Sequence, residues 1–273
     1  MVALDPKIAR SIAPLLGRVL IVDPAPSSAR MLAELLQNIG LGQVWTAATT
    51  AQGLRLAEEG NPQLIFTEYA CEGVDGLEFA RRLRRGGLPC RKAPVIMVTA
   101  QATPASIIGA RDSGVHEFLR KPFTIKDLMR RLEAVAVKPR DWIEAVGYVG
   151  PDRRRFNSGD YKGARRRRAD EGGDPTEARI VQALKIVSSA LNAIEQDRPQ
   201  AFRALNAQAA AIQNAAALLR RPALITAAHG LQRRLGEIRQ SGELTREAIE
   251  VEALALLAYL PPEEPRRDAR PAA

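Results

Sequence analysis

The sequence predicts an α/β domain followed by an all-α domain, and three observations lead to this prediction. Residues 18–137 alternate short apolar runs with amphipathic segments, five times in succession. Residues 141–173 are rich in arginine, and from residue 174 the composition shifts to Ala, Leu, Gln, Glu and Arg. Repeated strand–helix units predict a parallel sheet with helices on both faces, because a helix forms the usual crossover between parallel strands.

The length of 273 residues also favours two domains over one. We expect five segments in order along the chain: an N-terminal helix over 1–17, the α/β domain over 18–140, an arginine-rich linker or arm over 141–173, a helical domain over 174–262 and a disordered tail over 263–273.

The strands of the α/β domain are predicted from apolar runs of four to six residues. The run Val-Leu-Ile-Val at 19–22 is typical of a strand that is buried on both faces of its sheet. Ser27 and Ser28 are expected to cap the first helix. The predicted strands are 19–22, 43–46, 63–68, 95–99 and 116–120, and the helices between them cover about 27–39, a segment from 49–50 onward, 77–85, 104–113 and 124–137.

Polar side chains stand at the ends of four of these strands. Asp23 follows the first strand, Glu68 closes the third, Thr99 closes the fourth and Lys121 follows the fifth. In open parallel sheets the functional residues gather at the carboxyl ends of the strands. The sequence therefore predicts a pocket that contains two carboxylates, a hydroxyl and an ammonium group.

The spacing of these residues resembles the receiver domain of response regulators, of the CheY type. The likeness rests on four motifs in order: Val-Leu-Ile-Val-Asp23, Glu68 with Gly73-Val-Asp75-Gly76, Met97-Val-Thr99-Ala100, and Lys121-Pro122-Phe123. It implies a flavodoxin-like sheet with strand order 2-1-3-4-5, a Lys-Pro bond that is often cis, and a role in two-component, phosphorelay signal transduction. Thr99 occupies the place of the family's switch hydroxyl, and Phe118 that of its switch aromatic residue.

The chain departs from the family pattern at two positions. Receivers hold Mg²⁺ with two adjacent acidic residues after strand one and with the acceptor Asp, whereas here Asp23 is followed by Pro24, and Glu68 replaces the acceptor. The extra methylene of Glu68 moves its carboxylate by roughly 1.5 Å, a bond length. Phosphoryl transfer and Mg²⁺ binding both depend on accurate positioning. We therefore expect a degenerate phospho-acceptor pocket of a pseudo-receiver, formed by Asp23, Glu68, Thr99 and Lys121, with a degraded metal site.

Several interpretations of this pocket remain open. Glu68 imitates part of a phosphoryl group by reaching toward Lys121 and Thr99, or it is a relic with a structural role. Asp23 and Lys121 neutralise one another as a buried pair, or the receiver keeps residual phosphorylation. In each case we expect protein partners of a signalling pathway to contact the face between the fourth helix and fifth strand, with Phe118 as an interface residue.

The arginine-rich segment contains an internal repeat. Tyr148-Val-Gly150-Pro-Asp-Arg153-Arg-Arg recurs 13 residues later as Tyr161-Lys-Gly163-Ala-Arg-Arg166-Arg-Arg, and residues 152–168 carry +6 of the total net charge of +9. Pro, Gly, Asn, Ser and Asp between the copies predict a loop. Arginine suits phosphate recognition because its planar fork forms paired hydrogen bonds and stacks on flat rings.

The segment is similar to the arginine-rich arm of CheY-like effectors that bind cyclic di-GMP, and this likeness makes cyclic di-GMP a candidate ligand. Nucleic acid, an acidic membrane surface, a protein contact and a solvated linker are the alternatives. The residues that would bind the nucleotide are Arg153, Arg154, Arg155, Asp160, Tyr161, Arg166, Arg167 and Arg168.

Helical periodicity begins at Asp174, which is followed by Pro at the first helical position. Helices are predicted near 175–196, 200–220, 223–240 and 245–260, as a bundle or as hairpins that form a homo-oligomer. His229 stands in a helix and faintly resembles the acceptor of histidine phosphotransfer domains, without their Lys-Gly pair.

Composition narrows the class of protein further. No apolar run reaches the ~18 residues of a membrane span, and residues 1–18 lack the apolar core of a signal peptide. The two cysteines form no disulfide framework, which favours the cytoplasm. No nucleophile–base pair, P-loop or metal cluster indicates an enzyme, and no cofactor is expected.

Overall fold

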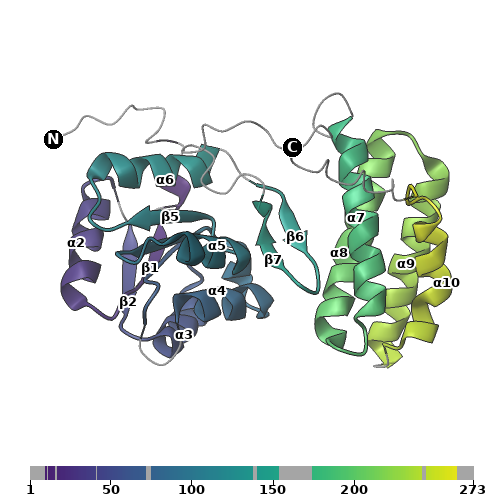
Figure 1. Cartoon of the computed structure of the whole chain (residues 1–273), viewed down its shortest axis with the longest axis horizontal. Coiled ribbons are helices and arrows are strands. Elements are labelled where there is room, and N and C mark those ends of the chain that lie inside the picture. The colour runs from purple at the N-terminus through teal and green to yellow at the C-terminus, as the bar shows by residue number, and fades with distance from the viewer. Residues whose placement is uncertain are drawn as a thin grey trace, which may run out of the picture. The chain divides into compact units, whose positions relative to one another are not determined.

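The structure is a computed structural model that describes residues 10, 12–15, 17–40, 42–71, 75–137, 140–153, 174–241 and 244–262 (Figure 1). The chain divides into two compact units, which are described separately below. The first comprises 1–143 with 147–163, and the second comprises 144–146 with 164–273.

The first unit is built on a parallel sheet of five described strands in the order β2-β1-β3-β4-β5, which confirms the predicted topology. Neighbouring strands pair in regular register, with Val22 of β1 opposite both Ala47 of β2 and Thr67 of β3. The strands are β1 (Arg18–Val22), β2 (Gln43–Ala47), β3 (Leu64–Thr67), β4 (Val95–Thr99) and β5 (Glu117–Arg120).

Helices cover both faces of this sheet, and the alternation along β1 shows how the sequence specifies the two layers. Val19 and Ile21 join one buried apolar cluster, whereas Leu20 and Val22 join the other. Successive side chains of a strand point to opposite faces, so a continuous apolar run contributes to both clusters. The covering helices are α2 (Pro26–Gln37), α3 (Thr50–Gly60), α4 (Gly76–Arg85), α5 (Pro104–Asp112) and α6 (Ile125–Val137), with short 3₁₀ turns η1 (Ala13–Leu15) and η2 (Pro89–Lys92).

Helix starts agree with the sequence at most positions and correct it at one. The hydroxyl of Thr49 accepts a hydrogen bond from the amide of Gln52, as expected of an N-cap. The first helix was expected to be capped by Ser27 and Ser28, but α2 already begins at Pro26. Proline fits the first helical turn because its missing N–H needs no partner there, and this frees the Ser28 hydroxyl for another contact.

The segment 141–173, predicted as an arginine-rich linker or arm, begins with a two-stranded sheet. Its strands are β6 (Trp142–Glu144) and β7 (Val149–Pro151). Tyr148 and Val149 are 7% and 5% exposed, so burial of these side chains stabilises a strand that the turn-forming composition conceals. Residues 154–173 lie outside the described part of the chain, as do the predicted tail 263–273 and most of the predicted helix 1–17.

Two glycines allow the second strand of this hairpin to approach the loop before β5. Gly114 and Gly150 have φ angles of +85° and +156°. A Cβ atom on Gly150 would lie 2.7 Å from the Cα atom of Gly114, and one on Gly114 would lie 2.6 Å from the carbonyl oxygen of Val149. Only glycine permits this backbone contact without displacement.

Arg84 of α4 is fully buried, and its side chain forms hydrogen bonds with the loops around the helix. Its Nε donates to the carbonyl of Gly114 at 2.9 Å, and its Nη1 donates to the carbonyls of Arg91 and Ala93 at 2.6 and 2.9 Å. Its Nη2 lies 3.1 Å from His116 Nδ1, and its Cζ lies 5.3 Å from the centre of the Trp142 ring. The pKa of Arg84 is lowered to about 9, chiefly by burial and also by the nearby cations Arg91 and Arg140.

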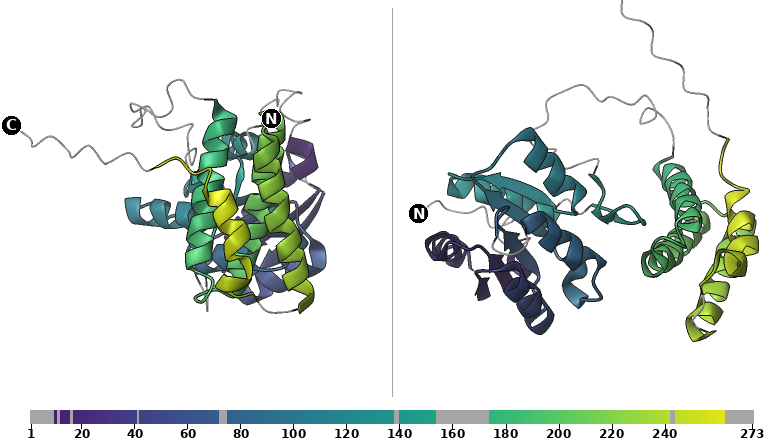
Figure 2. Two further views of the ribbon diagram at one scale, coloured as in Figure 1. Left: turned by 90° about the vertical axis from the view of Figure 1, so that its right-hand side faces the viewer. Right: turned by 60° about the horizontal axis from the view of Figure 1, so that its bottom comes forward.

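The described part of the second unit contains four helices that pack side by side (Figure 2, left). α7 packs against α8, α8 against α9, α9 against α10, and α10 against α7, so the four helices close a bundle around one apolar core. The helices are α7 (Pro175–Asn192), α8 (Arg198–Leu218), α9 (Pro222–Ser241) and α10 (Arg246–Leu257), which confirms the four predicted helices.

Small side chains let these helices approach closely. Ala201, Ala204, Ala209 and Ala216 of α8 are fully buried. Asp174 caps α7 by accepting a hydrogen bond from the amide of Thr176 at 2.8 Å, with Pro at the first turn as predicted. The alanine-rich composition therefore serves both helix propensity and packing.

Residues 144–146 belong to this helical unit. The side-chain amide of Gln200, which is fully buried, donates to Glu144 Oε1 at 3.1 Å and to the carbonyl of Ala145 at 3.2 Å. Gln208 donates to the carbonyl of Glu144 at 2.9 Å. These buried polar groups are paired, as an apolar interior requires. No helix in the described residues is long and apolar enough to cross a membrane.

We predict that Arg84→Met destabilises the first unit by about 3 kcal/mol, because three buried carbonyl oxygens lose charged donors. Urea unfolding followed by tryptophan fluorescence measures this unit selectively, since Trp45 and Trp142 both lie in it. Arg82→Met is the matched control, because Arg82 makes an exposed ion pair with Glu78. Its cost should stay below about 0.5 kcal/mol, and equal costs for the two variants would contradict the role of Arg84.

Candidate functional site

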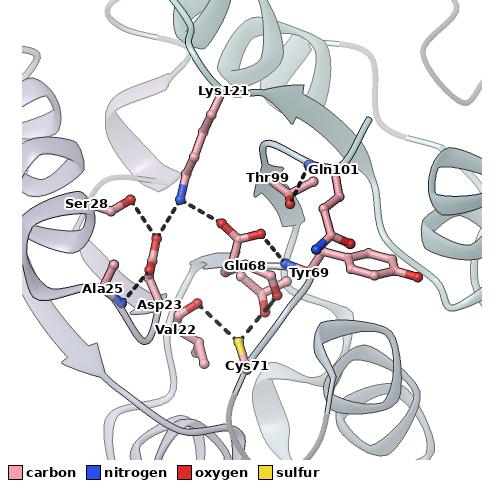
Figure 3. Close-up of polar contacts among 11 residues, drawn as sticks. Val22, Asp23, Ala25, Ser28, Glu68, Tyr69, Cys71, Thr99, Gln101 and Lys121 are labelled. Carbon is pink, nitrogen blue, oxygen red and sulfur yellow. Dashed lines mark hydrogen bonds and ion pairs between the residues drawn. The ribbon is translucent and has the colours of Figure 1, made fainter. Parts of the chain in front are cut away.

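The predicted pocket lies at the carboxyl edge of the sheet (Figure 3). Asp23 follows β1, Glu68 follows β3, Thr99 ends β4 and Lys121 follows β5, so the fold brings the four predicted residues to one edge. The Lys121–Pro122 peptide bond is cis, as the resemblance implied.

Lys121 bridges the two carboxylates of the pocket. Its Nζ lies 2.9 Å from Asp23 Oδ2 and 2.7 Å from Glu68 Oε2. The side chains of Asp23, Glu68 and Lys121 are 8%, 13% and 21% exposed. Charged hydrogen bonds of this length are strong in such partly buried surroundings, so this ammonium group ties the ends of β1, β3 and β5 together.

The other carboxylate oxygens have backbone or hydroxyl partners. The amide of Tyr69 donates to Glu68 Oε1 at 2.7 Å, and the amide of Ala25 donates to Asp23 Oδ1 at 2.8 Å. The hydroxyl of Ser28, which the sequence suggested as a helix cap, donates to Asp23 Oδ2 at 2.7 Å. Every carboxylate oxygen of the pair is therefore hydrogen-bonded within the protein.

Thr99 and Phe118 each make contacts that bear on the sequence analysis. In one of the interpretations left open there, Glu68 reaches toward both Lys121 and Thr99. Thr99 Oγ1 accepts a hydrogen bond from the amide of Gln101 at 3.1 Å. Phe118 was expected to be an interface residue, yet its side chain is only 3% exposed and belongs to a buried apolar cluster. An aromatic ring gains more from burial in that cluster than from exposure on the edge strand.

The donor set does not fit the Mg²⁺ ion that the fold family implies. Mg²⁺ requires several oxygen ligands in near-octahedral geometry, but an ammonium group already lies between Asp23 and Glu68. Pro24 supplies no second carboxylate after β1. Among the described residues, no group of three or more His, Cys, Asp or Glu side chains is arranged to hold a metal.

The electrostatics of the pocket follow from these contacts. Burial alone lowers the pKa of Lys121, but its hydrogen bonds to Glu68 and Asp23 outweigh burial and leave the pKa above its ordinary value. Burial, together with the charges of Glu68 and Asp23, raises the pKa of the nearby Cys71 thiol to about 11. Lys121 is therefore charged and Cys71 is a neutral thiol at physiological pH.

Glycine is required where α4 begins beside the pocket. The amide of Gly76 donates to the carbonyl of Tyr69 at 2.8 Å, and any side chain at Gly76 would collide with the carbonyl oxygen of Glu68. Asp75 caps the helix by accepting from the amide of Glu78 at 2.7 Å. The Asp-Gly pair thus places the start of α4 against the end of β3.

Of the eight predicted nucleotide-binding residues, Arg153 alone lies in the described part of the chain. Arg154, Arg155, Asp160, Tyr161 and Arg166–Arg168 lie outside it. Arg153 forms an ion pair with Asp112 at 3.0 Å, and its guanidinium lies 4.6 Å from the centre of the Tyr148 ring. Arg153 is therefore engaged by its own domain.

Sequence reasoning missed three residues of the pocket. Ser28, Tyr69 and Cys71 contact Asp23 or Glu68, and none of them stands at a strand end. The contact of Ser28 could have been predicted, because Pro26 starts the helix and a hydroxyl inside its first turn is then free from the role of cap. The contact of Tyr69 could not, because it is made by the backbone amide and does not depend on the side chain.

Comparison with known proteins places this geometry in context. Residues 19–133 match the family described as response regulator receiver domain. The chemotaxis protein CheY of Pseudomonas aeruginosa is 30% identical over 118 residues, which cover 43% of this chain and 94% of that protein. A protein described as probable chemotaxis protein CheY, from Rhizobium etli, is 31% identical over 118 residues, covering 43% and 91%. The solved structure of CheY4 of Vibrio cholerae is 26% identical, covers 44% of this chain and 98% of that chain, and gives a TM-score of 0.40.

We predict that Lys121→Met destabilises the first unit by about 2 to 3 kcal/mol, because two nearly buried carboxylates then face each other without a cation. Glu68→Gln in the wild-type background should cost about 1 kcal/mol. In the Lys121→Met background the same change removes a repulsion and should be neutral or stabilising. Urea unfolding of the two single variants and the double variant measures the coupling.

Additive effects, within about 0.3 kcal/mol, would show that the three groups do not act as one network. Lys126→Met serves as the control for loss of a cation on the same unit, since Lys126 is exposed on α6. That variant should cost less than about 0.5 kcal/mol.

Proposed function

The chain belongs to the response regulator receiver family through residues 19–133, and from this premise we propose that it is a pseudo-receiver. In this proposal the Glu68 carboxylate takes part of the role of a phosphoryl group on the missing Asp. The protein then acts in two-component signalling through contacts with partner proteins and without phosphotransfer.

The bond between Glu68 and Lys121 is the observation that carries this proposal. Glu68 Oε2 lies 2.7 Å from the Lys121 ammonium group. The longer side chain therefore brings an anionic oxygen to the cation of the pocket without phosphorylation of the protein. An incoming phosphoryl donor would have to displace this carboxylate and would find no second acidic residue beside Asp23. Both effects oppose an in-line transfer that depends on positioning.

The face formed by α5 and β5 is the proposed contact for a partner. Ile108 on α5 is 50% exposed, and Arg120 at the end of β5 and Lys126 on α6 are also exposed. Phe118 lies beneath this face and sets its shape from inside. One exposed apolar side chain and two exposed cations, on β5 and on the helices that contact it, suit a partner that offers an apolar contact edged by carboxylates.

In this proposal the arginine-rich arm binds a second signal, an anionic ligand. Cyclic di-GMP is the proposed ligand, with nucleic acid as the alternative, and the anionic character of both follows from the local charge of +6 over 152–168. Arg153 would have to exchange its contacts with Asp112 and Tyr148 for the nucleotide. The remaining seven residues of the predicted set stay predictions.

A homo-oligomer through the helical unit also stays a prediction. The most suitable surface in the described part is α10, where Val251 and Leu254 are 76% and 53% exposed. These two residues are three positions apart and so lie on the same face of the helix.

We predict that acetyl phosphate with Mg²⁺ leaves the wild-type protein unlabelled, whereas the double variant Pro24→Asp with Glu68→Asp gains an acid-stable, base-labile acyl phosphate. The double variant restores both the second acidic residue and the shorter acceptor, and Glu68→Asp alone should gain far less because the metal ligand is still missing. Intact-protein mass spectrometry measures the added phosphoryl mass.

The proposal is wrong if the wild type incorporates phosphate and Glu68→Gln abolishes the label. Circular dichroism of each variant confirms that the fold is kept. A silent double variant in a folded protein would show that features other than these two positions prevent transfer.

For the arm, we predict that calorimetry of the whole chain detects cyclic di-GMP binding with a Kd of roughly tens of micromolar or tighter. Changing Arg153–Arg155 and Arg166–Arg168 to Lys keeps the charge but removes the planar fork, and should weaken binding at least about tenfold. Equal affinity of the Lys variant, or a loss of affinity with salt as steep as nucleic-acid binding shows, would contradict a nucleotide clamp.

A further inference from the structure

One outer edge of the five-stranded sheet carries backbone groups that the sheet does not use. β2 is the strand at this edge, and in the described structure its partner is β1. The amide of Gln43 and the carbonyl of Ala47 both form hydrogen bonds with the β1 segment. Backbone groups alternate in direction along a strand, so the N–H and C=O groups of Val44 and Thr46 point away from β1.

The sequence of β2 leaves this edge without the usual protection. The strand reads Gln-Val-Trp-Thr-Ala and contains neither a charged residue nor a proline. The strand at the other edge, β5, begins with Glu117 and ends with Arg120. Charges and proline on an edge strand oppose pairing with another chain, so β2 is the edge that is open to an added strand. The amide of Ala48, just beyond β2, donates to Gln52 Oε1 at 3.1 Å and ends the open stretch.

A hollow of about 330 Å³ lies beside this edge, between β2 and α2. Pro26, Ala29 and Ala33 of α2 contribute to its lining, as do Thr46 and Ala48 at the end of β2. The alanine side chains are small, and this leaves space between the helix and the edge strand. An apolar cavity of about 150 Å³ holds one benzene ring, so the hollow has room for an aliphatic side chain of a ligand.

The hollow lies on the face of the sheet to which the side chains of Val44 and Thr46 point. Val44 packs against the same apolar cluster as Ala29 and Ala33, and Thr46, two residues later, points to the same face. In a strand added beside β2, alternate side chains would also point to this face. One of them would lie over the hollow while the backbone of the added strand pairs with Val44 and Thr46.

Arg30 of α2 gives the hollow a preference for a carboxylate. It belongs to the lining and is exposed, and it has no hydrogen-bond or ion-pair partner among the described residues. Asp23, which also lines the hollow, already accepts hydrogen bonds from Ser28 and Lys121. Glu34, one turn further along α2, makes no described contact with Arg30. A guanidinium group has five donors and no acceptor, and it binds a carboxylate through paired hydrogen bonds.

We propose that β2 and this hollow bind an extended acidic peptide segment of a partner protein, which adds a strand to the sheet. The peptide backbone pairs with Val44 and Thr46, an aliphatic side chain enters the hollow, and a carboxylate two residues away on the same face binds Arg30. In strand addition of this kind the main-chain hydrogen bonds supply affinity and the side-chain pockets supply specificity. The binding requires neither phosphate mimicry by Glu68 nor the arginine-rich arm.

The test uses the whole chain and a fluorescein-labelled peptide of sequence Thr-Leu-Thr-Glu-Thr, in which Leu and Glu share one face of the extended chain. Titration with the protein should raise the fluorescence anisotropy with a Kd between about 50 and 300 μM. Peptides with Gly for Leu or Gln for Glu should each bind about tenfold more weakly. Methylation of every peptide nitrogen removes the main-chain donors and should abolish binding.

Variants of the protein locate the site. Thr46→Pro removes the outward N–H without loss of a hydrogen bond to β1, and should weaken the peptide at least about tenfold in a protein with an unaltered circular dichroism spectrum. Thr46→Ala keeps this N–H and should bind as the wild type does. Arg30→Met should weaken binding about tenfold, whereas Arg55→Met, which removes an exposed cation from α3 on the opposite face, should leave it unchanged.

Three results would overturn the proposal. The first is no saturable change up to about 1 mM protein. The second is equal affinity of Thr46→Pro and Thr46→Ala, or of Arg30→Met and Arg55→Met. The third comes from sedimentation of the protein without peptide: a self-association that Thr46→Pro abolishes would show that a second copy of the chain, and not a peptide, occupies the edge.

Discussion

One ammonium group between two carboxylates determines how the carboxyl edge of the sheet is arranged. Lys121 lies 2.9 Å from Asp23 and 2.7 Å from Glu68, and through them it connects the ends of three strands. Two carboxylates that contact the same ammonium group would repel one another strongly if that cation were absent. The pocket therefore depends on Lys121 for its geometry, and this geometry leaves the carboxylates committed to the protein and not to a metal ion.

The opposite end of the same sheet depends on a second buried cation, which is neutralised in another way. The hydrogen-bond partners of Arg84 among the described residues are three carbonyl oxygens and the His116 ring, and its guanidinium lies near the Trp142 ring. A buried charge without a formal counter-ion is stable only where several dipoles converge on it. The α/β unit thus has a buried or partly buried cation at each end of its sheet, one paired with carboxylates and the other bonded to carbonyl oxygens. Function at the first end requires a change of partner for Lys121.

The sequence predicted those features that local pattern determines. Apolar runs such as 19–22 predicted the strands, the resemblance to receiver domains implied their order in the sheet, and strand-end positions indicated Asp23, Glu68, Thr99 and Lys121. Sequence patterns did not predict the features that depend on tertiary contacts. Arg84 stands in the run Arg-Arg-Leu-Arg-Arg, which is typical of a solvated helix face, and only the carbonyls of distant loops make it a buried residue. Tyr148 and Val149 lie in a segment rich in turn-forming residues, and their strand exists because the loop at Gly114 accepts it.

The contacts of Tyr148, Gly150 and Arg153 offer a structural explanation for the first copy of the Tyr-x-Gly-x-x-Arg repeat. In the first copy, Tyr148 is buried beneath Arg153, Gly150 meets the backbone of Gly114, and Arg153 pairs with Asp112. Each of these three residues has a structural partner in the first unit, so folding alone explains their spacing. Nucleotide binding through Arg153 would have to compete with these contacts.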